Sequence, residues 1–342
     1  MRIRSFVSCL VFVAMVICPA IADGLTSSAF AQGKPGQPIV SAEEQNMAKA
    51  IMSAPDAAAK LKAAAELIKK HPKTVLRPRV AGALADQIAK LTDAAQKVSL
   101  AQEYQKIFNE PTEQELIVPV LIDGLVSANR HDEAFSVGAE FLARNPDSLR
   151  VLIGLMSTGA DQVKRKNPKF IEQSLKYGSR AIELMEADKK PANVDDADWK
   201  QYKTEMLPGL YQSMGILNLA KGNRAEAKAR YMKASELVPS DPFNFVMLAG
   251  ILTDEYQTEA KRYQGMPDGP AKQDELKKVQ AMIDNVIDAT AHAIALSEGN
   301  AALQQIRQQY LKDLESYYKY RHNNSTAGMQ QLIDKYKSPA KP

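Results

Sequence analysis

The chain has 342 residues, 45% of them hydrophobic and 25% charged, which is enough to build a sizeable core. Its 44 basic and 40 acidic residues leave a net charge of +4, which argues against a nucleic-acid-binding or polybasic membrane protein. Both cysteines, Cys9 and Cys18, lie near the N-terminus. The rest of the chain therefore has no thiol for disulfides, metal sites or nucleophilic catalysis.

The N-terminal residues have the composition of a secretory signal peptide. Two arginines precede an apolar stretch, 6–18, that is short for a membrane span. Small residues at suitable spacing allow cleavage after Ala22 or after Ala31, and we expect the second, which gives a signal peptide at 1–31. The alternatives are an uncleaved anchor and lipid attachment at Cys18. The protein is therefore expected in the periplasm or cell envelope of a bacterium, or outside the cell.

A series of helices is predicted after the signal peptide. Residues 32–40 are a flexible leader rich in Gly and Pro, and Ser41-Ala-Glu-Glu44 has the spacing of a capping box that starts the first helix. Much further along the chain, another helix opens near Asp196 and is expected to be bent or restarted at Pro208. Between these points, apolar periodicity predicts helices at about 57–70, 79–90, 93–108, 112–128, 131–144, 148–162 and 168–186.

The sharpest internal break is Gly265–Pro270. After it, apolar residues at helical spacing predict a long amphipathic helix over 276–294, and two shorter apolar stripes predict further helices. β-branched residues do not alternate with polar ones over a useful length, so no strand is expected. The predicted organisation is a repeat region of helices at 41–264 and a C-terminal helical cap at 271–337.

One segment, Pro208–Asp241, carries a regular pattern of small, aromatic and helix-ending residues. Gly215 lies inside a helix, where glycine costs about 1 kcal/mol against alanine unless the missing side chain lets another helix approach. The small side chains of Ala227 and Ala234 are expected to meet that gap. The pattern comprises Tyr211, Met214, Gly215, Gly222, Ala227, Tyr231, Ala234 and Pro239. Of these, Gly222 suits a left-handed helix end, and Pro239 cannot continue the second helix.

This spacing resembles a tetratricopeptide repeat (TPR), roughly 34 residues of helix–turn–helix. It departs from the pattern at Asn218, where a large aromatic residue is expected. Looser matches begin at Pro242 and occur over 121–146 and 152–181. The resemblance implies an all-α, right-handed solenoid of helical hairpins with a concave, peptide-binding groove. The family's groove positions fall here on Gln212, Ile216, Leu219, Val246 and Thr253.

Residue types that carry catalysis or bind metals are scattered. No two of the four histidines lie within one helical turn, so a paired-histidine zinc site is not expected. Asp195-Asp196-Ala197-Asp198 fits a helix start better than a calcium loop. The run Tyr317–His322 is expected to pack and cap its helix, with a protein or glycan contact as the alternative. No phosphate-loop or nucleophile-elbow motif occurs, and no cofactor is expected.

We therefore expect a non-enzymatic scaffold that binds a protein or peptide partner. No nucleic-acid partner and no membrane span after signal cleavage are expected. Three alternatives stay open: a structural subunit of an envelope complex without a peptide ligand, an all-α envelope enzyme acting on glycans, and a carrier of lipids or small molecules. The sequence does not indicate the identity of the partner or the oligomeric state.

Overall fold

The computed structural model describes residues 40–191 and 194–337. The expected signal peptide, its two possible cleavage positions and residues 32–39 of the leader lie outside these residues. Every regular element of the described part is helical, which confirms the all-α fold expected from the sequence. In that part, no helix is both long and apolar enough to cross a membrane.

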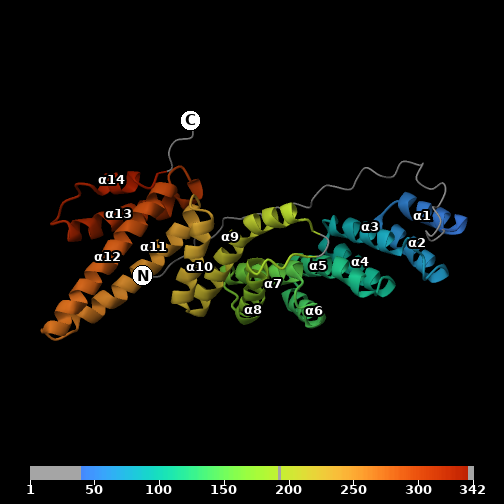
Figure 1. Ribbon diagram of the computed structural model, residues 1–342, viewed down its shortest axis with the longest axis horizontal. Helices are drawn as coiled ribbons and strands as arrows, with labels where there is room; N and C mark the ends of the chain where they lie inside the picture. Colours follow the sequence, from blue (N-terminus) through green and yellow to red (C-terminus); the bar gives the residue numbers. More distant parts are fainter. Residues whose placement is uncertain (1–39, 192–193, 338–342) are drawn as a thin grey trace. The chain divides into compact units, whose positions relative to one another are not determined.

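Most helices pack against their neighbours in sequence as hairpins, the arrangement of a TPR-like solenoid (Figure 1). Their bounds are α1 Ala42–Ser53, α2 Ala57–Lys70, α3 Arg77–Ala89, α4 Ala94–Ile107, α5 Pro111–Ser127, α6 His131–Arg144, α7 Leu149–Lys164, α8 Ile171–Glu186, α9 Asp196–Lys221, α10 Arg224–Leu237, α11 Pro242–Gln264, α12 Pro270–Leu296, the 3-10 helix η1 Ala301–Leu303, α13 Gln304–Arg321 and α14 Met329–Asp334.

The chain divides into two compact units, residues 1–158 and 159–342, which are described separately. In the first unit, α1 packs on α2 and α4 on α5, and helices two apart in sequence also touch, α2 with α4 and α3 with α5. Contacts of this kind are what stacking of hairpins requires, because one hairpin alone cannot bury its apolar face. The predicted capping box is present: the Glu44 N–H donates to Ser41 Oγ, and the Ser41 N–H donates to Glu44 Oε2.

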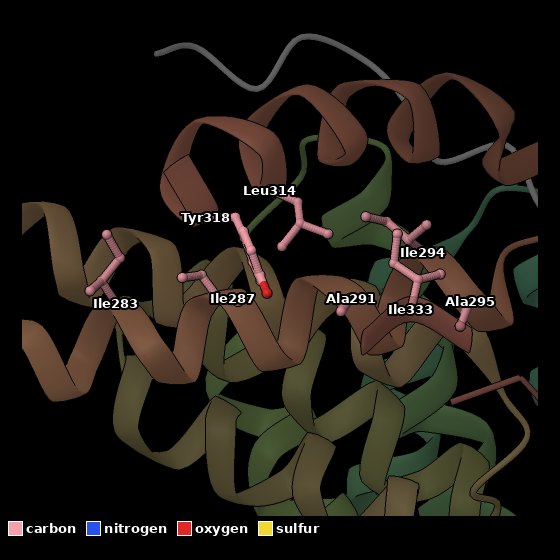
Figure 2. Packing of buried hydrophobic residues seen from close by; sticks show 8 residues of the cluster. All are labelled: Ile283, Ile287, Ala291, Ile294, Ala295, Leu314, Tyr318 and Ile333. Carbon is pink, nitrogen blue, oxygen red and sulfur yellow. The ribbon is translucent and has the colours of Figure 1, made fainter. Parts of the chain in front are cut away.

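In the second unit, α12 is the element around which the last helices gather. The apolar stripe predicted over 276–294 is present on α12, and its buried side chains pack against those of α13 and α14 (Figure 2). This cluster consists of Ile283, Ile287, Ala291, Ile294, Ala295, Leu314, Tyr318 and Ile333. The turn between α11 and α12 falls on the glycine- and proline-rich break predicted from sequence.

The helix α9 runs through Pro208 without the restart considered from the sequence. A proline inside a helix removes one backbone donor and crowds the preceding turn, but it does not have to end the helix. Here Pro208 is itself buried, and the buried side chains of Trp199 before it and Leu210 after it hold both halves of the helix in place. Tertiary packing therefore outweighs the local preference to break.

Candidate interaction surface

The packing of α9 on α10 is set by a glycine and a tyrosine. A Cβ placed on Gly215 would lie 2.6–2.9 Å from three ring atoms of Tyr231, whose side chain is fully buried. The expected close approach at Gly215 is therefore confirmed, but it is the Tyr231 ring that fills the gap. Ala227 and Ala234, expected there, are buried on either side of this ring along α10. An aromatic ring fits there because it is flat, and only a missing Cβ gives it room.

The end of α9 follows the chemistry expected from sequence. Gly222 has φ of 90°, the left-handed conformation, and the N–H of Asn223 donates to the carbonyl of Asn218 at 2.9 Å. The buried Asn218 side chain donates from Nδ2 to the carbonyl of Met214 at 2.8 Å. A polar residue therefore replaces the expected aromatic one because its donor is satisfied within the helix. The helix α10 ends at Leu237, before Pro239.

The remaining signature residues, Tyr211 and Met214, are buried on α9. The Tyr211 hydroxyl donates to the Glu186 carboxylate at the end of α8. Burial, together with this carboxylate, raises the pKa of Tyr211 well above its usual range, so the phenol stays neutral. The best-formed hairpin is thereby joined to the helix that precedes it.

The three groove positions predicted on α9 are half-buried and face the next hairpin. Gln212 donates from Nε2 to the Asp241 carboxylate and to Asn244 Oδ1, the latter at 3.1 Å. Ile216 and Leu219 pack against the cluster that joins α9, α10 and α11. Gln212 therefore stabilises the hairpin junction, and the exposed parts of Ile216 and Leu219 are what remains for a ligand.

A stripe on α9 extends this surface beyond the predicted residues. Gly209, Ser213, Ile216 and Ala220 recur at helical spacing and are each exposed or half-exposed. A Cβ placed on Gly209 would meet no atom within 4 Å, so this end of the stripe is open. Gly209 and Ser213 were not among the predicted positions, although they lie one helical turn before Gln212 and Ile216 in the sequence.

The predicted groove positions on α11 lie close to side chains of α13. Val246 is buried, and its carbonyl accepts a hydrogen bond from the Tyr310 hydroxyl at 2.8 Å. Gln257, one turn beyond the half-buried Thr253, donates to the Tyr317 hydroxyl at 3.4 Å. The predicted groove positions on α11 thus lie under or beside a C-terminal helix. Sequence reasoning did not place α13 there.

The candidates for metal and acid–base chemistry are not brought together. Within residues 40–191 and 194–337, no group of three or more His, Cys, Asp or Glu side chains could hold a metal ion. Asp195 caps α9 by accepting from the N–H of Asp198 at 2.8 Å, as expected for a helix start. In the run Tyr317–His322, Tyr318 is buried and stacks on His322, and Arg321 forms an ion pair with Asp284. That run packs and caps, as the sequence analysis expected.

Comparison with known proteins gives a remote structural likeness. No family model matches the chain, and no curated protein matches it. Among solved structures, the chain is similar to the C-terminal part of a TPR repeat-containing protein from Cytophaga hutchinsonii. The two share 12% sequence identity with a TM-score of 0.42, over 86% of this chain and all of that one.

Proposed function

We propose that this protein is a non-enzymatic scaffold that binds a protein or peptide segment through the exposed stripe of α9. The observation that carries the proposal is the contrast between α9 and α11. Gly209 on α9 is open, because a Cβ there would meet no atom of the described residues within 4 Å. In contrast, the predicted groove position Val246 on α11 is buried, and its carbonyl is bound by Tyr310 of α13. Stacked helical hairpins present such helix faces to other chains and bring no reaction chemistry of their own.

The chemistry of the stripe suits a peptide better than a charged ligand. Its accessible side chains are small, polar or aliphatic: Ser213, Ile216 and Ala220, with Gly209 leaving room beside them. Such a surface buries apolar side chains of a partner, while specificity comes from a few polar groups. The proposed location, outside the cytoplasm in the periplasm or cell envelope, rests on the N-terminal segment alone.

The test fills the open end of the stripe without disturbing the packing. Gly209→Gln adds a long side chain where nothing lies within 4 Å, and Gly82→Gln, at another open helical glycine on α3, is the matched control. Purified wild type and both variants are used to capture partners from the native envelope, and the affinity for each recovered partner is then measured with purified components. Circular dichroism checks that both variants stay helical.

The proposal expects Gly209→Gln to weaken binding of a recovered partner by roughly tenfold or more, equivalent to about 1.4 kcal/mol. Gly82→Gln should bind like the wild type. Equal affinity for all three proteins would move the binding surface away from α9. It would then favour a structural subunit that contacts its complex through another face.

A further inference from the structure

His292 of α12 lies between two aromatic rings from different helices. Its ring centroid is 3.7 Å from that of Phe245 on α11 and 4.2 Å from that of Tyr336, just after α14. The imidazole and the Tyr336 ring are nearly parallel, at 12°. Tyr336 also donates from its hydroxyl to the Asp288 carboxylate, one turn before His292. The stack therefore ties the end of α14 to α12.

The charges around this stack do not favour a protonated imidazole. The Lys335 ammonium lies 4.6 Å from the centroid of the Tyr336 ring, the same ring that stacks on His292. A proton on His292 would place a second cation on that ring. Asp288 of the same helix attracts such a proton. Lys335 and Asp288 form an ion pair at 3.9 Å. Tyr310 of α13 is packed in the cluster next to Phe245, and its hydroxyl is bound to the Val246 carbonyl.

Burial of the imidazole has the largest effect on the protonation of His292. It lowers the pKa of His292 below its ordinary value of 6.5, with Lys335 acting in the same direction and Asp288 against it. Since the Tyr336 ring covers one face of the imidazole, undocking of α14 exposes His292 to water and raises its pKa toward the ordinary value. The proton consequently binds the undocked form more tightly, and docking is strongest above pH 6.5 and weakens as the pH falls below it.

The helix α14 is short enough for the protonation of His292 to affect its docking on α12. It has 6 residues, too few for a stable helix on its own. Its buried anchor is Ile333, which packs with Ala291 and Ile294 of α12 (Figure 2). Met329, Leu332 and Tyr336 pack against the same cluster. A terminal element of this length opens locally at a lower free-energy cost than the long helices, so a change in docking energy changes its open population.

We propose that His292 is a pH-sensitive clasp for α14: protonation of its imidazole releases α14 from α12 and uncovers the apolar face formed by Ala291, Ile294 and Ala295. The device is independent of the stripe on α9. It makes the C-terminal helices respond to mild acidification, which an element held by aliphatic contacts alone would not do.

Hydrogen exchange of α14 tests this directly in the full chain. The amides of Leu332 and Lys335, which donate within the helix, report its opening. After correction for the intrinsic pH dependence of exchange, their protection should fall roughly two- to tenfold between about pH 7.5 and 5.5 in the wild type. In His292→Gln, which cannot take up a proton, protection should be the same at both values. Amides of α10 serve as the internal control.

Two outcomes would overturn the clasp: the same pH dependence of α14 in His292→Gln, or stronger protection of α14 in acid. If His292→Gln fails to dock α14 at either pH, the wild type still decides the matter by NMR. The His292 ring must titrate below pH 6.5, and the α14 resonances must change with the same midpoint. Midpoints that differ would contradict the proposal. Lys335→Met, which removes the cation that already lies on the Tyr336 ring, should reduce the loss of protection.

Discussion

Two glycines on α9 show how one missing Cβ can serve opposite purposes. At Gly215 the space is filled by the ring of Tyr231, so the glycine is required by packing. At Gly209 the space is empty, so glycine only weakens the helix relative to alanine. The same residue type is thus structural at one position and leaves an accessible surface at the other.

The first prediction separates these two roles. Gly215→Ala forces the Tyr231 ring to move inside a filled core and should lower the free energy of unfolding by about 1–3 kcal/mol. Gly209→Ala removes backbone entropy from the unfolded chain and should raise the free energy of unfolding by about 0.4–1 kcal/mol. Denaturant unfolding of both variants measures the difference. A Gly215→Ala protein as stable as the wild type would mean that the close approach of α10 to α9 is not needed.

The second prediction concerns the hydroxyl of Tyr231. It is buried and has no hydrogen-bond partner among the residues that the structure describes, and its burial raises the pKa of Tyr231 well above the usual range. A buried polar group without a partner loses its hydration and gains nothing in return. Tyr231→Phe keeps the ring over Gly215 and should be neutral or stabilising by about 1 kcal/mol. A clearly destabilised Tyr231→Phe would indicate that the hydroxyl has a water partner.

At the scale of elements, one arginine joins three helices of the first unit. Arg77 of α3 donates from Nε to Glu113 Oε1 of α5 at 2.6 Å and from Nη2 to the Ile107 carbonyl of α4 at 3.3 Å. The side chain of Glu113 is 5% exposed and that of Arg77 11%. The hydrogen bond to Glu113 raises the pKa of Arg77. This ion pair therefore fixes α3 against the next hairpin from inside the packed helices.

The third prediction follows from that burial. Glu113→Gln leaves the buried Arg77 guanidinium with only the exposed Glu110 carboxylate, 3.5 Å away, as a counter-charge and should destabilise the first unit by about 3 kcal/mol. Its matched control is Glu133→Gln, which removes one partner of the exposed Arg130–Glu133 pair and should leave stability unchanged within error. Thermal unfolding followed by circular dichroism measures both. Equal effects of the two substitutions would show that the buried pair does not hold α3 to α5.

Helix ends that are set by neighbouring residues could be predicted from the sequence, whereas features that depend on contacts between distant residues could not. The ends of α9 and α10 follow from Gly222 and Pro239, and the turn before α12 from its run of glycines and prolines, because these residues act on their own backbone. The continuity of α9 through Pro208 was not predictable, since it depends on burial on both sides. The contact between α11 and α13 depends on Tyr310 reaching Val246, 64 residues away in sequence, and no local pattern encodes that contact.

At the scale of the whole molecule, the all-α architecture follows from the repeated hairpin, whereas the accessible surface follows from its irregularities. The hairpin of α9 and α10 keeps the repeat pattern, but α11 is extended and Tyr310 of α13 binds its Val246 carbonyl. Of the five groove positions taken from the resemblance, Val246 is buried and the other four are half-buried, and Ile216 is the one that lies on the stripe of α9. Irregular elements therefore decide which of the predicted groove positions are accessible.

The central claim is that the open stripe of α9 is the binding surface. Site-specific photo-cross-linking tests it most directly: a photoreactive residue replaces Gly209 in one protein and Gly82 in another, since both positions are open. After irradiation in the native envelope, we predict a discrete covalent adduct with a partner protein from position 209 and none from position 82. No adduct from position 209, or the same adducts from both positions, would contradict the claim.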